Sequence, residues 1–225
     1  MADRCLLYYI TDRSQFRGDE QTRRRALLAK VAEAARAGVD YIQLREKDLS
    51  AKELEMLARD ALSVLRNDTR PRTENREPRT RLLVNSRTDV VLAAGGDGVH
   101  LRADDLSPRE VRAVVQFSAC QPATGHFLVA ASCHAAADVL RAESGKADFV
   151  VFAPVFGKRG SVETPPAGLA ALREACQAKI PVLALGGVTM ENAASGLQAG
   201  AAGVAGIRLF QENKIEDVVR ALRAL

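Results

Sequence analysis

The chain has 225 residues, of which 47% are hydrophobic and 27% are charged, and its formal net charge at pH 7 is +4. This composition is ordinary for a soluble globular protein and too hydrophobic for a disordered chain. No run of about 18 apolar residues occurs, so we expect no membrane span, and an acidic residue comes too early for a signal peptide. The four cysteines lack metal-ligand spacing, which favours reduced thiols and a cytoplasmic protein.

Most of the net positive charge falls in residues 66–81, which contain six arginines, three acidic residues, two prolines and no aromatic residue. A nucleic-acid site combines a basic patch with stacking aromatics, so we interpret this stretch as a solvated loop and expect no nucleic-acid partner. The sequence shows no domain boundary. We therefore predict a single domain over 1–225 that carries this basic, proline-containing insertion.

The same order of residues recurs around Gly38, Gly95, Gly145 and Gly200. Small or helix-forming residues come first, then the glycine, then one or two short residues, and then an apolar run rich in strand-forming residues. Each glycine is predicted to end a helix in the left-handed conformation, which glycine adopts without steric strain. The spacings are 57, 50 and 55 residues, and each holds one further strand and two helical patterns. Half a spacing is therefore one strand-plus-helix unit.

Eight predicted strands follow, and most are near-continuous apolar runs, as in parallel strands covered on both faces. They span residues 6–12, 41–46, 81–86, 98–101, 127–132, 149–154, 181–187 and 203–208. Helical patterns lie between them, for example at 21–37, 51–65 and 166–178, and the segment 105–108 carries an N-cap signal followed by proline. The alternation predicts an α/β fold, a (β/α)8 TIM barrel. A doubly wound open sheet is the alternative, but no dinucleotide-binding fingerprint follows the first predicted strand.

In such a barrel the chemistry lies where the strands end. Gln43, Arg45 and Lys47 alternate on one face of the second predicted strand. Two cations and an amide suit an anionic ligand such as phosphate, because arginine can bind phosphate oxygens through two N–H groups. The alternative, of equal weight, is pairing with an inward carboxylate such as Asp12.

Glycines and basic residues follow the later strands. Gly186 and Gly187 come after the seventh strand, and Arg208 ends the eighth, which is where this fold usually binds phosphate. The alternative for the glycines is a tight turn that needs positive φ. The loop 157–168, which contains Lys158, is predicted to be a basic lid, with a solvated surface loop as the alternative.

Two further predictions concern titratable side chains. Asp105 and its neighbour Asp104 are candidate Mg²⁺ ligands, or else one of them caps a helix. His134 is a candidate general acid or base, although a lone histidine is more often a structural donor. Cys133 precedes it on a strand, so the two side chains face opposite ways and a Cys–His dyad is rejected.

Five segments in order along the chain resemble the thiamine-phosphate synthase family and its close relative, the thiazole tautomerase (TenI-like) branch. They are YYITD, GVDYIQLREKDLS, LLVNSRTDVVLAAGGDGVHLRADDLS, ASCHAAADVLRAESGKADFVVFAPVF and PVLALGGVTMENAASGLQAGAAGVAGI. They cover almost the whole chain, and IQLREKDL is highly specific. The resemblance implies a (β/α)8 barrel that joins hydroxymethylpyrimidine diphosphate to a thiazole phosphate, releases pyrophosphate and uses Mg²⁺.

The resemblance also implies roles for individual residues. The implied substrate-binding residues are Gln43, Arg45, Lys47, Asn85, Ser132, Lys158, Gly186, Gly187, Ile207 and Arg208. Catalytic roles are implied for His134, Lys158 and Arg45. The implied metal positions are Asp105 and Ser86.

The chain departs from the family pattern at the predicted mouth of the barrel. Ser86 stands where the synthases usually have a second Mg²⁺ carboxylate, and Arg102 follows the fourth strand in place of a glycine. A Gly-Lys-Arg-Gly-Ser segment replaces the usual Pro-Thr-x-Thr-Lys, so Lys158 matches the family lysine loosely. Arg208 replaces a serine. Together these changes remove a negative charge and add guanidinium groups.

Three hypotheses follow for the activity. The first is a Mg²⁺-dependent transferase of thiamine biosynthesis, a thiamine-phosphate synthase that couples the two phosphorylated rings. The second is a tautomerase that moves a proton through His134 without metal, and the third is a non-catalytic regulator that binds a phosphate ligand. Small phosphate and diphosphate substrates are the expected partners, and the sequence leaves open whether the chain forms a homo-oligomer.

Overall fold

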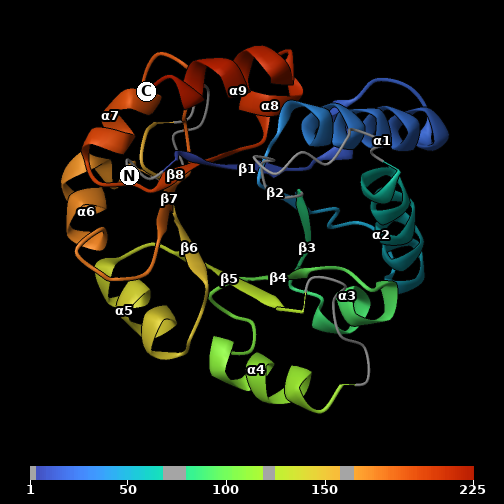
Figure 1. The fold of residues 1–225 in the computed structure, drawn as a ribbon, viewed down its shortest axis with the longest axis horizontal. Coiled ribbons are helices and arrows are strands. Elements are labelled where there is room, and N and C mark those ends of the chain that lie inside the picture. The colour runs from blue at the N-terminus through green and yellow to red at the C-terminus, as the bar shows by residue number, and fades with distance from the viewer. Residues whose placement is uncertain (1–3, 68–79, 119–124, 158–164) are drawn as a thin grey trace.

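The computed structural model describes residues 4–67, 80–118, 125–157 and 165–225 (Figure 1). Within them, eight parallel strands pair in chain order and close into a barrel, which confirms the (β/α)8 prediction over the open sheet. The strands are β1 (Leu6–Ile10), β2 (Tyr41–Leu44), β3 (Arg81–Asn85), β4 (Gly98–Leu101), β5 (Leu128–Cys133), β6 (Phe149–Phe152), β7 (Val182–Ala184) and β8 (Gly203–Gly206). Each begins within one residue of its predicted start.

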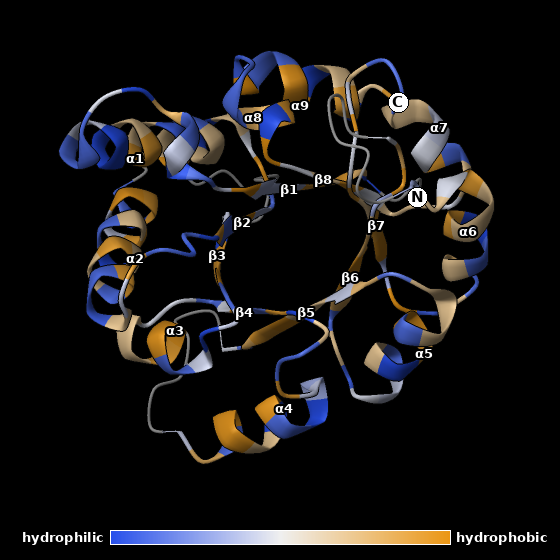
Figure 2. Cartoon of the chain, turned by 180° about the vertical axis from the view of Figure 1, so that it is seen from behind, coloured by the Kyte–Doolittle hydropathy of each residue, from blue (hydrophilic) through white to orange (hydrophobic). Residues whose placement is uncertain are grey.

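The helices alternate with the strands and form an outer ring (Figures 1 and 2). They are α1 (Glu20–Ala37), α2 (Ala51–Arg66), α3 (Thr88–Ala94), α4 (Pro108–Gln116), α5 (Ala136–Ser144), α6 (Gly168–Ala175), α7 (Ala193–Gln198), α8 (Arg208–Gln211) and α9 (Ile215–Arg223), with the 3-10 turn η1 (Arg13–Gln15) after β1. Among the described residues, no helix has the length and apolar character that crossing a membrane requires.

Two of the segments singled out in the sequence can be placed. Helix α4 begins with Pro108, and its N-cap is Ser107, whose hydroxyl accepts the Glu110 N–H, so Asp105 does not cap this helix. In the predicted insertion 66–81, Arg66 ends α2 and Arg81 begins β3. Residues 68–79 of that insertion lie outside the described residues.

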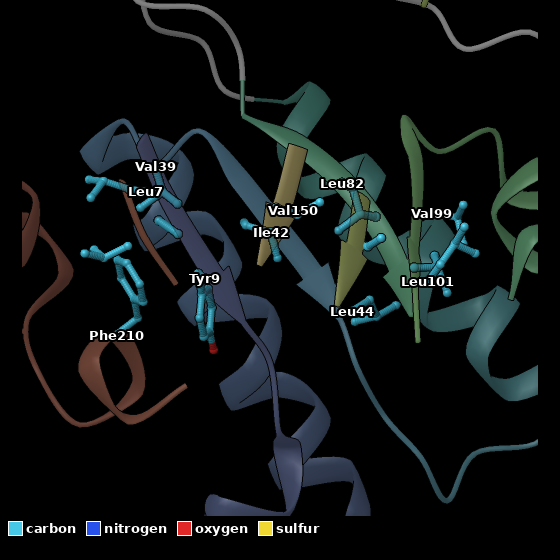
Figure 3. Close-up of a cluster of buried hydrophobic side chains, with 14 of the residues drawn as sticks. Leu7, Tyr9, Val39, Ile42, Leu44, Leu82, Val99, Leu101, Val150 and Phe210 are labelled. Atoms are coloured by element: carbon cyan, nitrogen blue, oxygen red, sulfur yellow. The ribbon is translucent and has the colours of Figure 1, made fainter. Parts of the chain in front are cut away.

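Alternation along the strands divides the buried side chains into two layers. Leu7 and Tyr9 of β1 face the helices, whereas Tyr8 and Ile10 face the barrel interior. Figure 3 shows part of the outer layer, in which apolar side chains of successive strands lie in one continuous cluster. In Figure 2, most helices carry both hydrophobic and hydrophilic colours, as expected when one face packs on a barrel.

The barrel interior is closed at the end where the strands begin, which we name the lower rim. Tyr41 and Phe149 stack there with ring centroids 4.7 Å apart. Tyr8 meets Phe149 edge to face at 5.4 Å, and it is fully buried. These three rings form an aromatic floor. The opposite end, where the strands finish, is the mouth.

Three carboxylates, two buried and one partly buried, fix the strand register at the lower rim. Asp40, Asp97 and Asp148 stand directly before β2, β4 and β6. Each accepts the backbone N–H of a residue in the preceding strand, at 2.7, 2.8 and 2.6 Å respectively. Ala202 holds the equivalent place before β8 and has no side-chain acceptor. Each carboxylate also pairs with a guanidinium group, those of Arg223, Arg81 and Arg112 in turn.

The position of the turn before these strands explains one wrong prediction about the glycine pattern. The left-handed residue lies two positions before the aspartate: Gly38 has a φ of 89° and Gly95 a φ of 73°. Gly145 lies three positions before Asp148, and its φ is −78°. The left-handed conformation falls instead on Lys146, with a φ of 63°. Gly200, with a φ of 104°, lies two positions before Ala202 and not before an aspartate, so the position of the turn follows from the start of the next strand, three residues later, in all four cases.

Replacing Asp97 tests this account of the lower rim. Asp97→Ala removes the acceptor of a buried N–H and the partner of Arg81, so the free energy of unfolding should fall by about 1–3 kcal/mol. Asp60→Ala is the matched control, because Asp60 is exposed and, among the described residues, pairs only with Arg24, and its effect should stay below about 1 kcal/mol. Urea unfolding measures both. Equal effects would show that the buried carboxylate adds nothing to the register.

Candidate active site

Four neighbouring strands carry polar side chains on the interior face near the mouth. They are Gln43 of β2, Asn85 of β3, His100 of β4 and Ser132 of β5. Each lies two positions after a residue of the interior face, and because side chains alternate along a strand, it lies on the interior face as well. Gln43 is 2% exposed, and its amide donates to Asn85 Oδ1 at 2.9 Å. Asn85 donates in turn to Ser86 Oγ at 3.0 Å. The structure thus brings together three residues that the sequence predicted for the site.

The ring of His100 joins this polar group to the aromatic floor. Its Nδ1 lies 3.1 Å from the hydroxyl oxygen of Tyr8, and its Nε2 lies 2.8 Å from Ser132 Oγ. Burial, and then the nearby charge of Arg45, lower the pKa of His100 to about 3, so the ring is neutral at physiological pH. Burial raises the pKa of Tyr8 well above its usual value, so its phenol stays protonated.

An ionic network on the outer side of β2 holds the strand end. The Glu46 side chain is 1% exposed and accepts from the Thr11 hydroxyl at 2.6 Å and the Arg13 backbone N–H at 2.9 Å. The Arg13 guanidinium binds the same carboxylate at 3.2 Å and binds Asp48 through two N–H groups. Thr11 Oγ1 accepts the backbone N–H of Arg45 at 3.0 Å. The network therefore fixes the backbone of Arg45.

The Arg45 side chain lies on the same face of the strand as Gln43 and is partly exposed. Within the described residues its guanidinium has no ion pair. Asp12, the partner considered in the alternative reading, accepts instead from Ser14 and Gln15. Lys47 is exposed beyond the strand end. This arrangement favours the anion-binding reading of Arg45 over the structural ion pair.

A cavity of about 620 Å³ lies at the other side of the mouth, where β7 and β8 end. Gly186 and Gly187 line it with φ values of 92° and 64°. A Cβ on Gly187 would stand 2.5 Å from the carbonyl oxygen of Gly157, so only glycine fits there. Ile207 and Arg208 line the same cavity, so four predicted residues meet here. The two glycines that need a positive φ are therefore also residues that line the cavity.

The predicted metal positions lie after β3 and β4. One carboxylate oxygen of Asp105 accepts the backbone N–H of Arg102 at 2.6 Å. The carboxylate of Asp104 pairs with the guanidinium of Arg102 at 2.6 Å. Ser86 has a φ of 60°, and its hydroxyl accepts from Asn85. In the part of the chain that the structure describes, no group of three or more His, Cys, Asp or Glu side chains could hold a metal ion.

His134 is exposed at the end of β5. Its Nδ1 lies 2.6 Å from the carbonyl oxygen of Ala153, so this nitrogen carries a proton, and within the described residues Nε2 has no hydrogen-bond partner. Cys133 is buried in the helix-facing layer, and burial raises the pKa of its thiol to about 12, in agreement with the rejected dyad. Lys158 and residues up to 164 of the predicted lid lie outside the described residues.

Sequence reasoning missed the residues that act by holding others. His100 and Tyr8 were not assigned to the site, and neither was the set of Thr11, Arg13 and Glu46. A signal existed for the first pair, because strand parity places Tyr8 and His100 on the interior face. The second set had no local signal, since Glu46 stands 33 residues from Arg13.

Comparison with known proteins gives consistent results. The family model described as thiamine monophosphate synthase matches residues 7–210. The thiamine-phosphate synthase of Methanoculleus marisnigri is 37% identical over 220 residues, which are 96% of this chain and 93% of that protein. That of Syntrophomonas wolfei is 33% identical over 224 residues, 97% and 95% of the two chains. The solved thiamine phosphate pyrophosphorylase of Pyrococcus furiosus superposes with a TM-score of 0.76 at 25% identity, covering 99% of this chain and 95% of that one.

The ionic network predicts unequal effects for two similar substitutions. Glu46→Gln places an amide donor where two donors and a guanidinium converge on a buried carboxylate, so the free energy of unfolding should fall by on the order of 3 kcal/mol. Asp48→Asn removes the exposed partner of the same arginine and should lower it by less than about 1 kcal/mol. Chemical denaturation compares them, and a larger effect of Asp48→Asn would contradict the network's role.

Proposed function

The chain belongs to the thiamine monophosphate synthase family, and we propose that its mouth couples hydroxymethylpyrimidine diphosphate to thiazole phosphate and releases pyrophosphate. This is the transferase activity of a thiamine-phosphate synthase in thiamine biosynthesis. The matches to thiamine-phosphate synthases over nearly the whole chain favour it over the tautomerase and the binding-only alternatives.

One observation carries the assignment of residues: the mouth has two different halves. Strands β2–β5 present Gln43, Asn85 and Ser132 with the cation of Arg45 nearby. Strands β7 and β8 present a glycine-lined cavity that ends at Arg208. A reaction that joins two phosphorylated rings needs two such sites facing a common centre, because holding both reactants in place replaces a bimolecular encounter.

The polar half suits the pyrimidine diphosphate. A carboxamide offers both a donor and an acceptor, which matches the edge of an aminopyrimidine, and the hydrogen bond to Asn85 fixes how Gln43 is turned. Arg45 has no carboxylate partner within the described residues, so its guanidinium is available to the diphosphate. When the diphosphate departs, negative charge grows on its oxygens, and a guanidinium held in place stabilises that charge.

The glycine half suits the thiazole phosphate. Gly186 and Gly187 carry no side chain to keep a phosphate away from the backbone, and Arg208 adds an exposed cation at the rim of the cavity. Holding the phosphate there places the thiazole nitrogen to attack the pyrimidine methyl cation. His134 stays a predicted catalytic residue, and no described residue hydrogen-bonds its Nε2.

The donor set also fits a Mg²⁺ ion. Such an ion is typically held by one or two carboxylates together with substrate phosphates, and Asp105 has one carboxylate oxygen that no described residue contacts. Asp105 would hold the ion with the diphosphate, and Ser86 would stand beside it. When bound, Mg²⁺ supplies positive charge to the leaving diphosphate.

A direct assay tests the proposed reaction. Purified protein is mixed with hydroxymethylpyrimidine diphosphate, thiazole phosphate and Mg²⁺, and thiamine phosphate is followed by mass together with released pyrophosphate. We expect both products in equal amounts and at a rate proportional to enzyme. Binding of either phosphate without any product would contradict the proposal.

Substitution of Ser86 tests the metal assignment. Ser86→Asp adds a carboxylate at the second predicted metal position, so the Mg²⁺ concentration for half-maximal activity should fall on the order of tenfold. Ser86→Asn is the matched control, because asparagine and aspartate both tolerate the positive φ of this position but only aspartate is charged. A Mg²⁺ titration of the rate reads both variants. The same shift in both, or none in either, would place this residue away from the metal.

A further inference from the structure

A buried chain of hydrogen bonds runs from the aromatic floor to the mouth, through Tyr8, His100 and Ser132. The two contacts are 3.1 Å and 2.8 Å long. Tyr8 is 0% exposed and His100 is 3% exposed, whereas Ser132 is partly exposed. Within the described residues, the hydroxyls of Tyr8 and Ser132 have no hydrogen-bond partner other than this ring. A neutral imidazole between two hydroxyls can pass hydrogen bonds in either of two directions.

In the first direction the ring proton is on Nδ1. Nδ1–H then donates to the Tyr8 oxygen, and the phenolic hydrogen of Tyr8 has no acceptor although it is completely buried. Ser132 must use its own hydrogen to donate to Nε2. The hydroxyl of Ser132 then offers only lone pairs to the mouth. This arrangement leaves a buried polar hydrogen unsatisfied and presents a phosphate anion with an acceptor.

In the second direction the ring proton is on Nε2. Tyr8 donates its only hydrogen to Nδ1, and Nε2–H donates to Ser132 Oγ. Every buried polar group then has a partner, and the Ser132 hydrogen points away from the ring. Since Tyr8 can satisfy its buried hydrogen only in this way, it selects the direction of the whole chain.

We propose that Tyr8 and His100 are positioning residues that hold Ser132 as a hydrogen-bond donor to an anionic oxygen of the diphosphate substrate. The inference rests on the proposed function, which supplies that diphosphate. An isolated serine hydroxyl donates or accepts equally well, so it does not distinguish an anion from other ligands. With one lone pair occupied by Nε2–H, the remaining hydrogen is directed to the mouth before substrate arrives.

The tautomer of His100 can be read directly without substrate. In protein labelled with ¹⁵N-histidine, the nitrogen spectrum separates protonated from unprotonated ring nitrogens. The chain has three histidines, and His100→Gln identifies the signals of this ring. We expect a protonated Nε2 and an unprotonated Nδ1 in the parent protein, and a change in this pattern in Tyr8→Phe. A protonated Nδ1 in the parent protein would overturn the inference.

A binding cycle tests the consequence at the mouth, with inorganic pyrophosphate and Mg²⁺ as the probe and calorimetry as the readout. Tyr8→Phe should weaken binding about fivefold, since Ser132 loses its fixed direction as a donor to an anion. In a Ser132→Ala background the same substitution should have no effect, because no hydroxyl is left to orient. An equal loss in both backgrounds, or no pyrophosphate binding by the parent protein, would count against the proposal.

Tyr9→Phe is the matched control for packing and stability. Tyr9 is also 0% exposed, lies on the opposite face of the same strand, and gives up one hydroxyl hydrogen bond, to Gln211 at 3.2 Å. It should lower stability as Tyr8→Phe does and leave pyrophosphate binding unchanged. The assay for thiamine phosphate separates the two claims. If no thiamine phosphate forms but the pyrophosphate-binding results are as expected, only the proposed reaction is wrong. If thiamine phosphate forms but Nδ1 of His100 is protonated, only this inference is wrong.

Discussion

Three aspartates at the lower rim, two of them buried and Asp148 partly buried, set the register on which the rest of this barrel depends. Asp40, Asp97 and Asp148 each tie the start of one strand to a backbone N–H of the strand before it. In a strand, a shift of one residue moves every side chain to the opposite face. A contact that fixes the register at the lower rim therefore decides, three residues later, which side chains point into the mouth.

The consequence is visible in the division between the two buried layers. With the observed register, Gln43 and Asn85 lie on the interior face, and Leu44 and Val84 join the helix-facing layer. The opposite register would place two aliphatic side chains at the mouth and two amides among apolar helix residues, where their hydrogen bonds could not be met. The packing of the barrel and the position of the polar side chains at the mouth therefore depend on the same strand register, which the contacts at the lower rim fix.

Much of this organisation could be predicted from the sequence because its signals are local. Glycine before an apolar run marks the start of a strand, and polar residues mark its end. These signals predicted the barrel, and they predicted that residues such as Gln43, Gly187 and Arg208 lie at its mouth. The rest depends on partners far apart in the chain. Nothing near Glu46 shows that Thr11 and Arg13 will surround it, and His100 gains its importance only from Tyr8, 92 residues away. The turn at Lys146 was mispredicted because the left-handed residue stands three positions before the strand start, and at β6 that position holds lysine and not glycine.

Tyr8 connects the two requirements of the proposed chemistry. A pyrimidine methyl cation reacts with water, so the site must keep water from reaching it by any route except the mouth. The ring of Tyr8 helps to close the lower end, because it packs edge to face on Phe149, which stacks on Tyr41. Its hydroxyl, on the same side chain, begins the chain of hydrogen bonds that reaches Ser132. One residue thus seals the floor against water and orients a donor toward the leaving group, which explains why a polar aromatic side chain suits this position better than phenylalanine.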